Sequence, residues 1–166
     1  MRTRLAADAD AEAIRAIYNT EVVGSTVTFD LVPRSPAEQR QWLAEHRGAH
    51  PAIVAVASDG SVAGFASVSP YRTRPAYATT VEDSVYVRAD FRGQGVGRVL
   101  LGDLVDLAQA HGFHAVMARI ADHQEASMAL HRACGFELVG VEREIGRKFG
   151  KWLDVVVMQR LLATGP

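Results

Sequence analysis

The most informative stretch of this chain is the glycine-rich sequence Arg92-Gly93-Gln94-Gly95-Val96-Gly97. It follows residues 81–87, whose side chains alternate between two faces as in a strand, and it opens residues 96–111, whose apolar positions recur with helical period. Glycines at such a junction let the backbone pass close to a ligand, and the helix start adds unpaired N–H groups and a positive dipole end. The stretch therefore predicts a turn that binds a phosphate or pyrophosphate group.

Two common phosphate-binding motifs do not fit this turn. The dinucleotide fingerprint needs a third glycine where the chain has Arg98, and the Walker motif needs a Gly-Lys-Ser/Thr sequence that does not follow. A plain glycine-rich connection between a strand and a helix, without a ligand, remains the alternative interpretation of these residues taken alone.

Outward from the turn, strand-like and helix-like segments follow one another along the chain. Strands are expected at residues 3–5, 52–57, 62–69, 81–87, 114–120, 136–141 and 152–161, with turns at Asp59-Gly60 and at 146–150. Helices are expected after a cap at Asp8 or Asp10, from Ser35 to about Gly48, over 96–111, and from a cap at Asp122 to Gly135. The pattern predicts one α/β domain over residues 1–166, with a mixed central sheet of about seven strands flanked by about four helices.

Composition and charge argue against several classes of protein. The 166 residues carry a net charge of −1 with no long run of one sign, which argues against nucleic acid or an anionic membrane as partner. No apolar run is long enough to span a bilayer, and the N-terminal sequence lacks the apolar core of a signal peptide. The single cysteine, Cys134, excludes a disulfide within the chain and favours a reducing compartment, so a cytoplasmic protein is expected.

The arrangement Arg-x-x-Gly-x-Gly, after a strand and opening a helix, resembles the coenzyme A pyrophosphate loop of the GNAT acyltransferase superfamily. The order of strands and helices resembles that superfamily over nearly the whole chain, and residues 125–136 resemble its second cofactor helix. Within GNAT, the chain is similar to the phosphinothricin and methionine sulfoximine N-acetyltransferase family. The segments that carry this similarity are Asn19 with 25–29, 70–77 with 80–87, His131, and 148–154 with Met158-Gln159.

The resemblance implies the GNAT acyl-CoA N-acyltransferase fold, acetyl-CoA as cofactor and a homodimer. It also implies direct transfer of acetyl to the primary amine of a small amino-acid-like acceptor, such as phosphinothricin, methionine sulfoximine or methionine sulfone, with detoxification as one role. The alternatives are another amine, such as a polyamine, an aminoglycoside or a protein N-terminus, and a non-catalytic acetyl-CoA-binding sensor. A near-neutral chain with a basic pair in the acceptor loop argues mildly against cationic acceptors.

Carried over residue by residue, the resemblance implies cofactor contacts along the central strand, the glycine turn and the second cofactor helix. These residues are Val85, Tyr86, Val87, Arg92, Gly93, Gln94, Gly95, Val96, Gly97, Arg98, Gln124 and Ser127. Gln124 departs from the pattern, which has Asn at that place, so its amide lies one methylene farther from the backbone.

Two residues are candidates for proton transfer. Glu82 begins the central strand on the same face as Ser84 and Tyr86, and a carboxylate in a closed cleft can serve as general base, directly or through a water. His131 lies four residues after Ser127, so both occupy one helix face, from which His131 could orient a ligand or relay a proton. The alternatives are an ordinary exposed Glu and a packing His.

The predicted acceptor site combines aromatic, cationic and polar side chains. Arg72 and Arg74 suit the carboxylate of an amino acid, although a pair of solvated loop charges is the alternative. The aromatic residues Phe29, Tyr77 and Trp152 are equally typical of a hydrophobic core. No histidine spacing suggests a metal site. The expected acceptor residues are Phe29, Arg72, Thr73, Arg74, Tyr77, Glu82, Asp83, Ser84 and Trp152.

Overall fold

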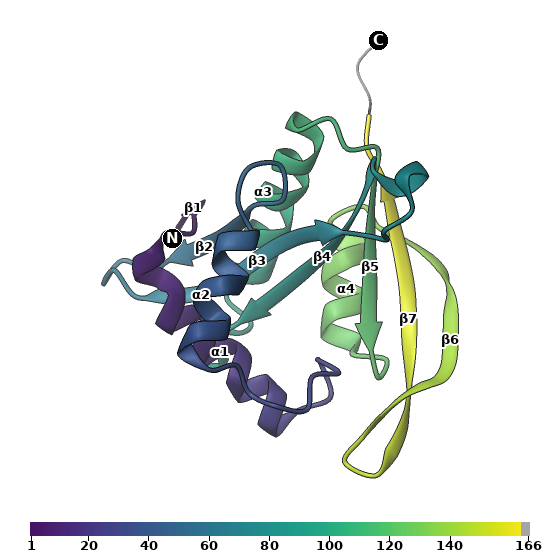
Figure 1. The fold of residues 1–166 in the computed structure, drawn as a ribbon, viewed down its shortest axis with the longest axis horizontal. Helices are drawn as coiled ribbons and strands as arrows, with labels where there is room; N and C mark the ends of the chain where they lie inside the picture. The colour runs from purple at the N-terminus through teal and green to yellow at the C-terminus, as the bar shows by residue number, and fades with distance from the viewer. Residues whose placement is uncertain (164–166) are drawn as a thin grey trace.

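A computed structural model describes residues 1–163 of the chain. Their strands form one sheet in the order β1-β2-β3-β4-β5-β7-β6, in which the β4–β5 pair is parallel and the others are antiparallel (Figure 1). The strands are β1 (Arg2–Leu5), β2 (Ala52–Val56), β3 (Val62–Pro70), β4 (Thr80–Val87), β5 (Ala115–Ala121), β6 (Glu137–Lys148) and β7 (Lys151–Leu161). The predicted mixed sheet is therefore confirmed.

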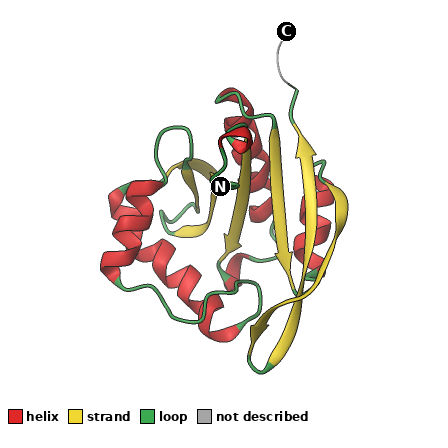
Figure 2. Cartoon of the chain, turned by 45° about the vertical axis from the view of Figure 1, so that its right-hand side comes forward, coloured by secondary structure: helices red, strands yellow, loops and turns green. Residues whose placement is uncertain are grey.

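Four α-helices occur in the described residues, two on each face of the sheet (Figure 2). They are α1 (Ala11–Gly24), α2 (Pro36–Glu45), α3 (Val96–Ala110) and α4 (Glu125–Ala133), with short 3-10 helices at Asp8–Asp10, Pro75–Tyr77 and Ala89–Phe91. No helix within residues 1–163 has the length and apolar character needed to cross a membrane.

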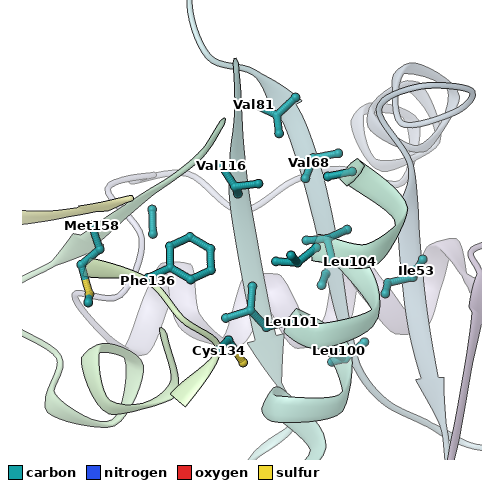
Figure 3. Packing of buried hydrophobic residues seen from close by; sticks show 14 of the residues in the cluster. Ile53, Val68, Val81, Leu100, Leu101, Leu104, Val116, Cys134, Phe136 and Met158 are labelled. Atoms are coloured by element: carbon teal, nitrogen blue, oxygen red, sulfur yellow. The ribbon is translucent and has the colours of Figure 1, made fainter. Parts of the chain in front are cut away.

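The larger hydrophobic core lies between the sheet and helices α3 and α4 (Figure 3). Leu100, Leu104, Val116 and Met158 are all inaccessible to solvent there. A second cluster packs α1 and α2 against β2 and β3 on the other face. Because β4 alternates between these faces, its odd-numbered residues contact the α3 side and its even-numbered residues the α1 side, as the sequence predicted.

Helix α2 shows how a local sequence signal sets an element boundary. Ser35 Oγ accepts a hydrogen bond from the Glu38 N–H at 3.2 Å, and a Glu38 carboxylate oxygen accepts one from the Ser35 N–H at 2.7 Å. This reciprocal pair satisfies two backbone donors that the helix start leaves unpaired. The predicted start is confirmed, and the helix ends at Glu45, three residues before the expected Gly48.

Other predicted caps are wrong. Asp122 does not cap α4, whose capping residue is Gln124; Asp122 has a φ of 51° and its carboxylate bonds to the loop after α1. Asp10 stands at the capping position of α1, but its carboxylate accepts from the Ala7 N–H and pairs with Arg4. In both cases another partner binds the carboxylate, the distant Thr26 for Asp122 and the nearby Arg4 with the Ala7 N–H for Asp10.

The C-terminal hairpin is longer than predicted. The sequence suggested a turn over residues 146–150, yet Gly146, Arg147 and Lys148 pair with β7. The turn consists of Phe149 and Gly150, both with positive φ, 51° and 73°, which matches the tight turns that the twist of paired strands favours. The hairpin consequently extends well past the rest of the sheet (Figure 1).

The two central parallel strands separate soon after they pair. Thr80, Val81 and Glu82 of β4 pair with Ala115, Val116 and Met117 of β5, and no later residue of β4 pairs with β5. The strand β5 continues beside β7 instead, so β4 and β5 diverge toward their C-terminal ends (Figure 1). We call the space between the diverging halves the gap. It separates residues 83–87 from residues 118–121.

Candidate active site

The glycine-rich turn presents a row of free backbone donors. Gly93 and Gly95 have φ angles of 74° and 80°, a conformation that residues with a Cβ rarely adopt. Gly95 caps α3, and the Val99 N–H donates to its carbonyl at 3.2 Å. Within residues 1–163, none of the backbone N–H groups from Gly93 to Arg98 donates a hydrogen bond. These groups lie at the start of a helix and suit a pyrophosphate.

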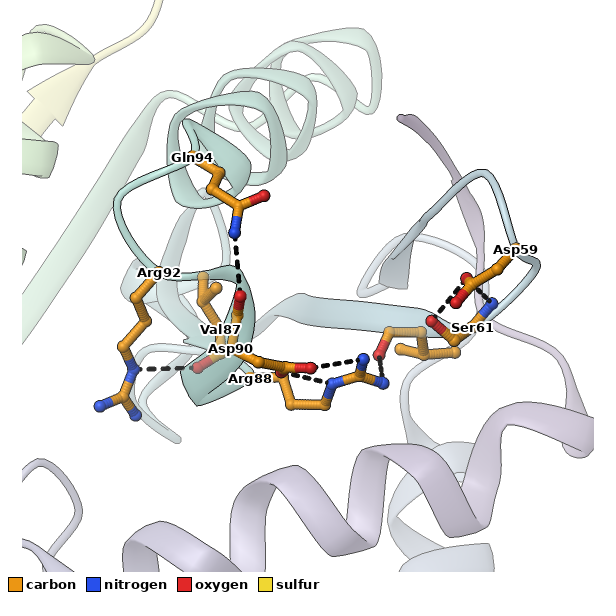
Figure 4. Close-up of polar contacts among 8 residues, drawn as sticks. Asp59, Ser61, Val87, Arg88, Asp90, Arg92 and Gln94 are labelled. Carbon is orange, nitrogen blue, oxygen red and sulfur yellow. Dashed lines mark hydrogen bonds and ion pairs between the residues drawn. The ribbon is translucent and has the colours of Figure 1, made fainter.

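The longer side chains of the turn are bonded within the chain (Figure 4). Arg92 Nε donates to the Val87 carbonyl at 3.2 Å, and another nitrogen of the same guanidinium pairs with the buried carboxylate of Glu21 at the end of α1. Gln94 Nε2 donates to the Asp90 carbonyl at 2.9 Å. The side chains of Arg92 and Gln94 therefore hold the turn in shape, and the ligand-binding capacity lies in the backbone.

Beside the turn, the β5-facing edge of β4 has no strand partner beyond Glu82. The Arg88 N–H donates to the Ala63 carbonyl of β3 at 2.9 Å, so even-numbered residues of β4 direct their backbone groups toward β3. The odd-numbered residues Val85 and Val87 direct their backbone N–H and C=O groups the other way, toward the gap. Such an edge suits an extended chain that carries amide groups, as the pantetheine arm of coenzyme A does.

Tyr86 contributes differently from its two neighbours. Its ring stacks on Phe65 and meets Tyr18 edge to face, each at 5.2 Å between ring centroids. The side chain therefore packs in the cluster beneath α1, and the backbone groups of Tyr86 are directed toward β3, so neither is directed toward the gap.

Asp83 and His131 form a buried ion pair between β4 and α4. His131 Nε2 lies 3.0 Å from Asp83 Oδ2 and His131 Nδ1 lies 2.7 Å from the Ser127 carbonyl, with the two side chains 5% and 4% exposed. Burial lowers the pKa of His131, but the Asp83 carboxylate and the Ser127 carbonyl together raise it above its ordinary value. A protonated imidazole donates from both nitrogens and fixes α4 against β4.

Asp83, which was expected to contact the acceptor, is bonded to His131 in this structure. Asp83 is buried with Val81 on the face that α3 and α4 cover, whereas Glu82 projects from the opposite face. His131 lies on the Asp83 side as well. The two residues predicted for proton transfer, Glu82 and His131, therefore stand on opposite sides of β4.

Glu82 occupies the point at which the gap begins. It is the last residue of β4 that pairs with β5, where it lies opposite Met117. Burial raises the pKa of Glu82; the charges of Arg119 and Arg72 oppose this rise, and that of Asp83 adds to it. A half-buried carboxyl whose pKa is raised holds a proton more strongly than an ordinary glutamate does, which suits a general base.

Two charged residues near Glu82, Arg119 and Glu142, were not expected from the sequence. Arg119 of β5 makes a two-pronged pair with Glu142 of β6, with Nη1–Oε1 and Nη2–Oε2 distances of 2.9 and 2.6 Å. Arg119 stands two positions after Met117, so strand alternation alone would have put it on the face of Glu82. Strand alternation does not indicate that Glu142 is the partner of Arg119, because β6 is two strands away from β5 in the sheet.

The loop after β3 brings together the side chains expected in the cationic part of the acceptor site. A hollow of about 660 Å³ is lined by Tyr71, Arg72, Thr73, Arg74 and Tyr77. The Arg72 guanidinium lies over the Tyr71 ring at 4.9 Å, and the Tyr71 and Tyr77 rings meet edge to face at 5.6 Å. The structure thus brings four predicted acceptor residues together and adds Tyr71.

A segment that we call the strap, residues 25–30, runs from the end of α1 to the C-terminal strands. Thr26 Oγ1 donates to Asp122 Oδ2 at 2.7 Å and accepts from Gln124 Nε2 at 3.3 Å. Asp122 and His123 both have positive φ, 51° and 50°, so the backbone there is strained. The Gln124 amide, expected to contact the cofactor, is bonded to the strap in this structure.

The far end of the strap lies on the hairpin. The buried Lys148 Nζ donates to the Thr28 carbonyl at 2.8 Å. The Phe29 ring lies so close to Gly146 that a Cβ there would be 2.3 Å from one of its atoms. Trp152 does not share this environment, because it is 60% exposed and contacts the Arg147 guanidinium at 5.0 Å. Phe29 is thus placed in the strap, and Trp152 at the outer end of the hairpin.

Neither a metal centre nor a reactive thiol is evident in residues 1–163. No three His, Cys, Asp or Glu side chains are grouped there so as to hold a metal ion. Cys134 is buried beside α3 and β5, and burial raises the pKa of its thiol. An acyl-cysteine mechanism therefore has no structural support.

A family model described as an acetyltransferase (GNAT) domain matches residues 3–157. The chain is also 40% identical over 165 residues to a phosphinothricin N-acetyltransferase of Streptomyces coelicolor, covering 98% of this chain and 96% of the relative. It is 41% identical over 152 residues to an L-methionine sulfoximine/L-methionine sulfone acetyltransferase of Pseudomonas paraeruginosa, covering 91% of this chain and 88% of the relative.

Solved structures show the same likeness. The crystal structure of a GNAT superfamily phosphinothricin acetyltransferase from Sinorhizobium meliloti, in complex with acetyl-CoA, superposes with a TM-score of 0.94. Its sequence is 40% identical, and the match covers 98% of this chain and 88% of that one. The fold expected from the resemblance is therefore confirmed.

The Asp83–His131 pair gives stability a defined pH dependence. Because the pKa of folded His131 is raised, its contribution is fully present below the unfolded pKa of about 6.5 and is lost as pH rises through the folded value. We expect His131→Gln to lower the free energy of unfolding most near pH 6 and progressively less at higher pH. Urea unfolding from pH 5.5 to 9 checks this, and a pH-independent difference would contradict it.

Proposed function

The chain belongs to the GNAT acetyltransferase family and uses acetyl-CoA, and on this premise we propose that it acetylates the primary amine of a small amino-acid-like acceptor of the phosphinothricin, methionine sulfoximine or methionine sulfone type. The names of its relatives support this acceptor class. The observation that carries the proposal is the position of Glu82, half-buried at the start of the gap and flanked by arginines.

Acetyl-CoA supplies the acetyl group as a thioester, whose thiolate is already a fair leaving group. The free N–H groups from Gly93 to Arg98 would hold its pyrophosphate, and the gap-facing backbone of Val85 and Val87 would hold its pantetheine arm. The same edge of β4 can place an N–H near the thioester oxygen, where negative charge develops during transfer.

Glu82 would act as general base, directly or through one water. An ammonium group has no lone pair, so the acceptor amine must lose a proton to become a nucleophile. Burial raises the pKa of Glu82, which brings its proton affinity nearer to that of the amine it serves. No covalent intermediate with the chain is required, and orientation of the two reactants accounts for much of the rate.

His131 would position the site rather than transfer a proton. Both of its ring nitrogens are bonded, to Asp83 and to the Ser127 carbonyl, so proton donation to a ligand would break a buried bond. Asp83 is adjacent to Glu82 in β4, and fixing Asp83 to α4 also fixes the backbone from which Glu82 projects.

The hollow at residues 71–77 favours an anionic acceptor over the alternatives. Arg72 and Arg74 line it, and no acidic side chain does. Guanidinium groups attract a carboxylate and repel polyamines and aminoglycosides. Thiol release from acetyl-CoA with a panel of amines tests the acceptor class. Faster release with polyamines than with phosphinothricin or methionine sulfone would overturn it.

Substitution of Glu82 tests the general base. We expect Glu82→Gln to lower kcat by about 100-fold or more, the usual size of a general-base contribution, with acetyl-CoA affinity within about threefold of wild type. In the wild type, kcat/KM should rise with pH through the raised pKa of Glu82, because the carboxylate must be unprotonated to act. Steady-state rates and calorimetry measure both quantities. Near wild-type turnover of the variant would remove Glu82 from this role.

The arginines of the hollow have a separate test. We expect Arg72→Ala and Arg74→Ala each to raise the KM for an amino-acid acceptor by about tenfold, through loss of hydrogen bonds to a carboxylate. The KM for acetyl-CoA should stay unchanged. If neither substitution alters the acceptor KM, the carboxylate-binding role is wrong.

We also propose that the chain forms a homodimer through β6. This strand is the edge of the sheet, and Leu138, Val139, Val141 and Ile145 on it are 44 to 58% exposed. An apolar edge strand of this length is normally covered. Light scattering should give twice the chain mass, and Val141→Lys should shift it toward the monomer. A monomeric wild type at micromolar concentration would refute the proposal.

A further inference from the structure

Arg119 faces the acceptor site from the sheet, opposite the loop that carries Arg72. Met117, two residues earlier in β5, lies opposite Glu82, so Arg119 projects from the same face as Glu82. Arg119 follows the last residue of β5 that pairs with β4, and it therefore stands on the far side of the gap from Ser84. The guanidinium of Arg119 therefore lies beside any acceptor whose amine is bound at Glu82.

Glu142 holds the Arg119 guanidinium in one orientation. The two-pronged pair has distances of 2.9 and 2.6 Å, and the side chains of Arg119 and Glu142 are 25% and 38% exposed. Since the strand β7 lies between β5 and β6, with Val157 opposite Arg119 in register, the Arg119 side chain reaches across β7 to Glu142. The pair fixes the charged end of Arg119.

The pair with Glu142 leaves part of the guanidinium free. A guanidinium has five N–H groups, and an end-on pair with a carboxylate uses two of them. Within residues 1–163, Glu142 is the acceptor for Arg119. The Nε–H and one further N–H of each terminal nitrogen remain for a ligand, which is enough for a second oxyanion to bind from the side.

The charges around Glu82 come from several elements. Arg119 of β5 and Arg72 of the loop after β3 are the cations, and Asp83 of β4 and Glu142 of β6 are the further anions. Asp83 lies on the opposite face, bonded to His131. On the acceptor side, Glu82 is thus flanked by two guanidinium groups, and an acceptor carrying an anionic oxygen group is attracted from both directions.

We propose that Arg119, oriented by Glu142, is a specificity-determining residue that binds an anionic oxygen group, carboxylate or phosphinate, of the acceptor. This inference rests on the proposed acetylation of small amino-acid-like amines. It assigns to the sheet a second anion-binding group, separate from the arginines of the hollow.

Three acceptors distinguish the possible binding groups. Phosphinothricin carries a carboxylate and a phosphinate, methionine sulfone carries a carboxylate and an uncharged sulfone, and methionine sulfone carboxamide carries neither anion. We expect Arg119→Met to raise the acceptor KM about 10- to 100-fold for phosphinothricin, the loss expected for charged hydrogen bonds. If the KM for methionine sulfone rises equally, Arg119 binds the carboxylate; if that KM does not rise, Arg119 binds the phosphinate. The KM for the carboxamide should change less than twofold.

Further variants separate binding from folding. Arg119→Lys keeps the charge but lacks the planar fork, so it should not restore the low KM. Glu142→Gln should raise the KM of the same acceptors about threefold, because the guanidinium loses its orienting partner. Arg40→Met, on the exposed side of α2, removes the same charge and should leave every KM unchanged. Calorimetry should show wild-type acetyl-CoA affinity in all four variants. If circular dichroism shows that Arg119→Met is unfolded, Arg119→Gln takes its place.

Two results would overturn the inference. Equal changes in KM for the carboxamide and the anionic acceptors would show that Arg119 shapes the site without recognising charge. No change for any acceptor would show that it does not reach the substrate. If the wild type turns over none of the three acceptors while binding acetyl-CoA, the proposed acceptor class fails first, and this inference with it.

Discussion

The separation of β4 from β5 after Glu82 is the constraint on which the rest of this structure depends. Two neighbouring parallel strands normally exchange hydrogen bonds along their length, and their separation leaves backbone groups that need other partners. Here Val85 and Val87 direct theirs into the gap, where a ligand can take the place of β5. In the middle of the sheet, the second half of β4 thus lacks a neighbouring strand on one side.

Contacts on both faces hold this opening in shape. On the α3 side, the Asp83–His131 pair joins β4 to α4 immediately after the last β4–β5 pairing. On the other side, the strap joins α1 to the start of α4 through Thr26 and to the hairpin through Lys148. The Arg92–Glu21 pair extends the same connection to the glycine turn. Cofactor-side and acceptor-side elements are therefore mechanically linked through one short segment.

Periodicity and turn chemistry were sufficient to predict the architecture and the position of the glycine turn. The alternation in β4 correctly placed Glu82 and Asp83 on different faces, because strand geometry allows nothing else. Contacts between distant segments were not predictable. Asp122 has the local pattern of a helix cap, but its partner is Thr26, 96 residues earlier in the chain. Arg119 is bonded to Glu142 two strands away, and no local signal indicates that Asp83 bonds to His131.

The two adjacent carboxylates of β4 have different surroundings, since Asp83 pairs with His131 in the core while Glu82 projects from the opposite face at the start of the gap. Their separation depends on strand phase alone, so inserting or deleting one residue within β4 would put aspartate in the site and glutamate in the core. A change in chain length is therefore compatible with this arrangement only outside β4, where it leaves the phase of the strand intact.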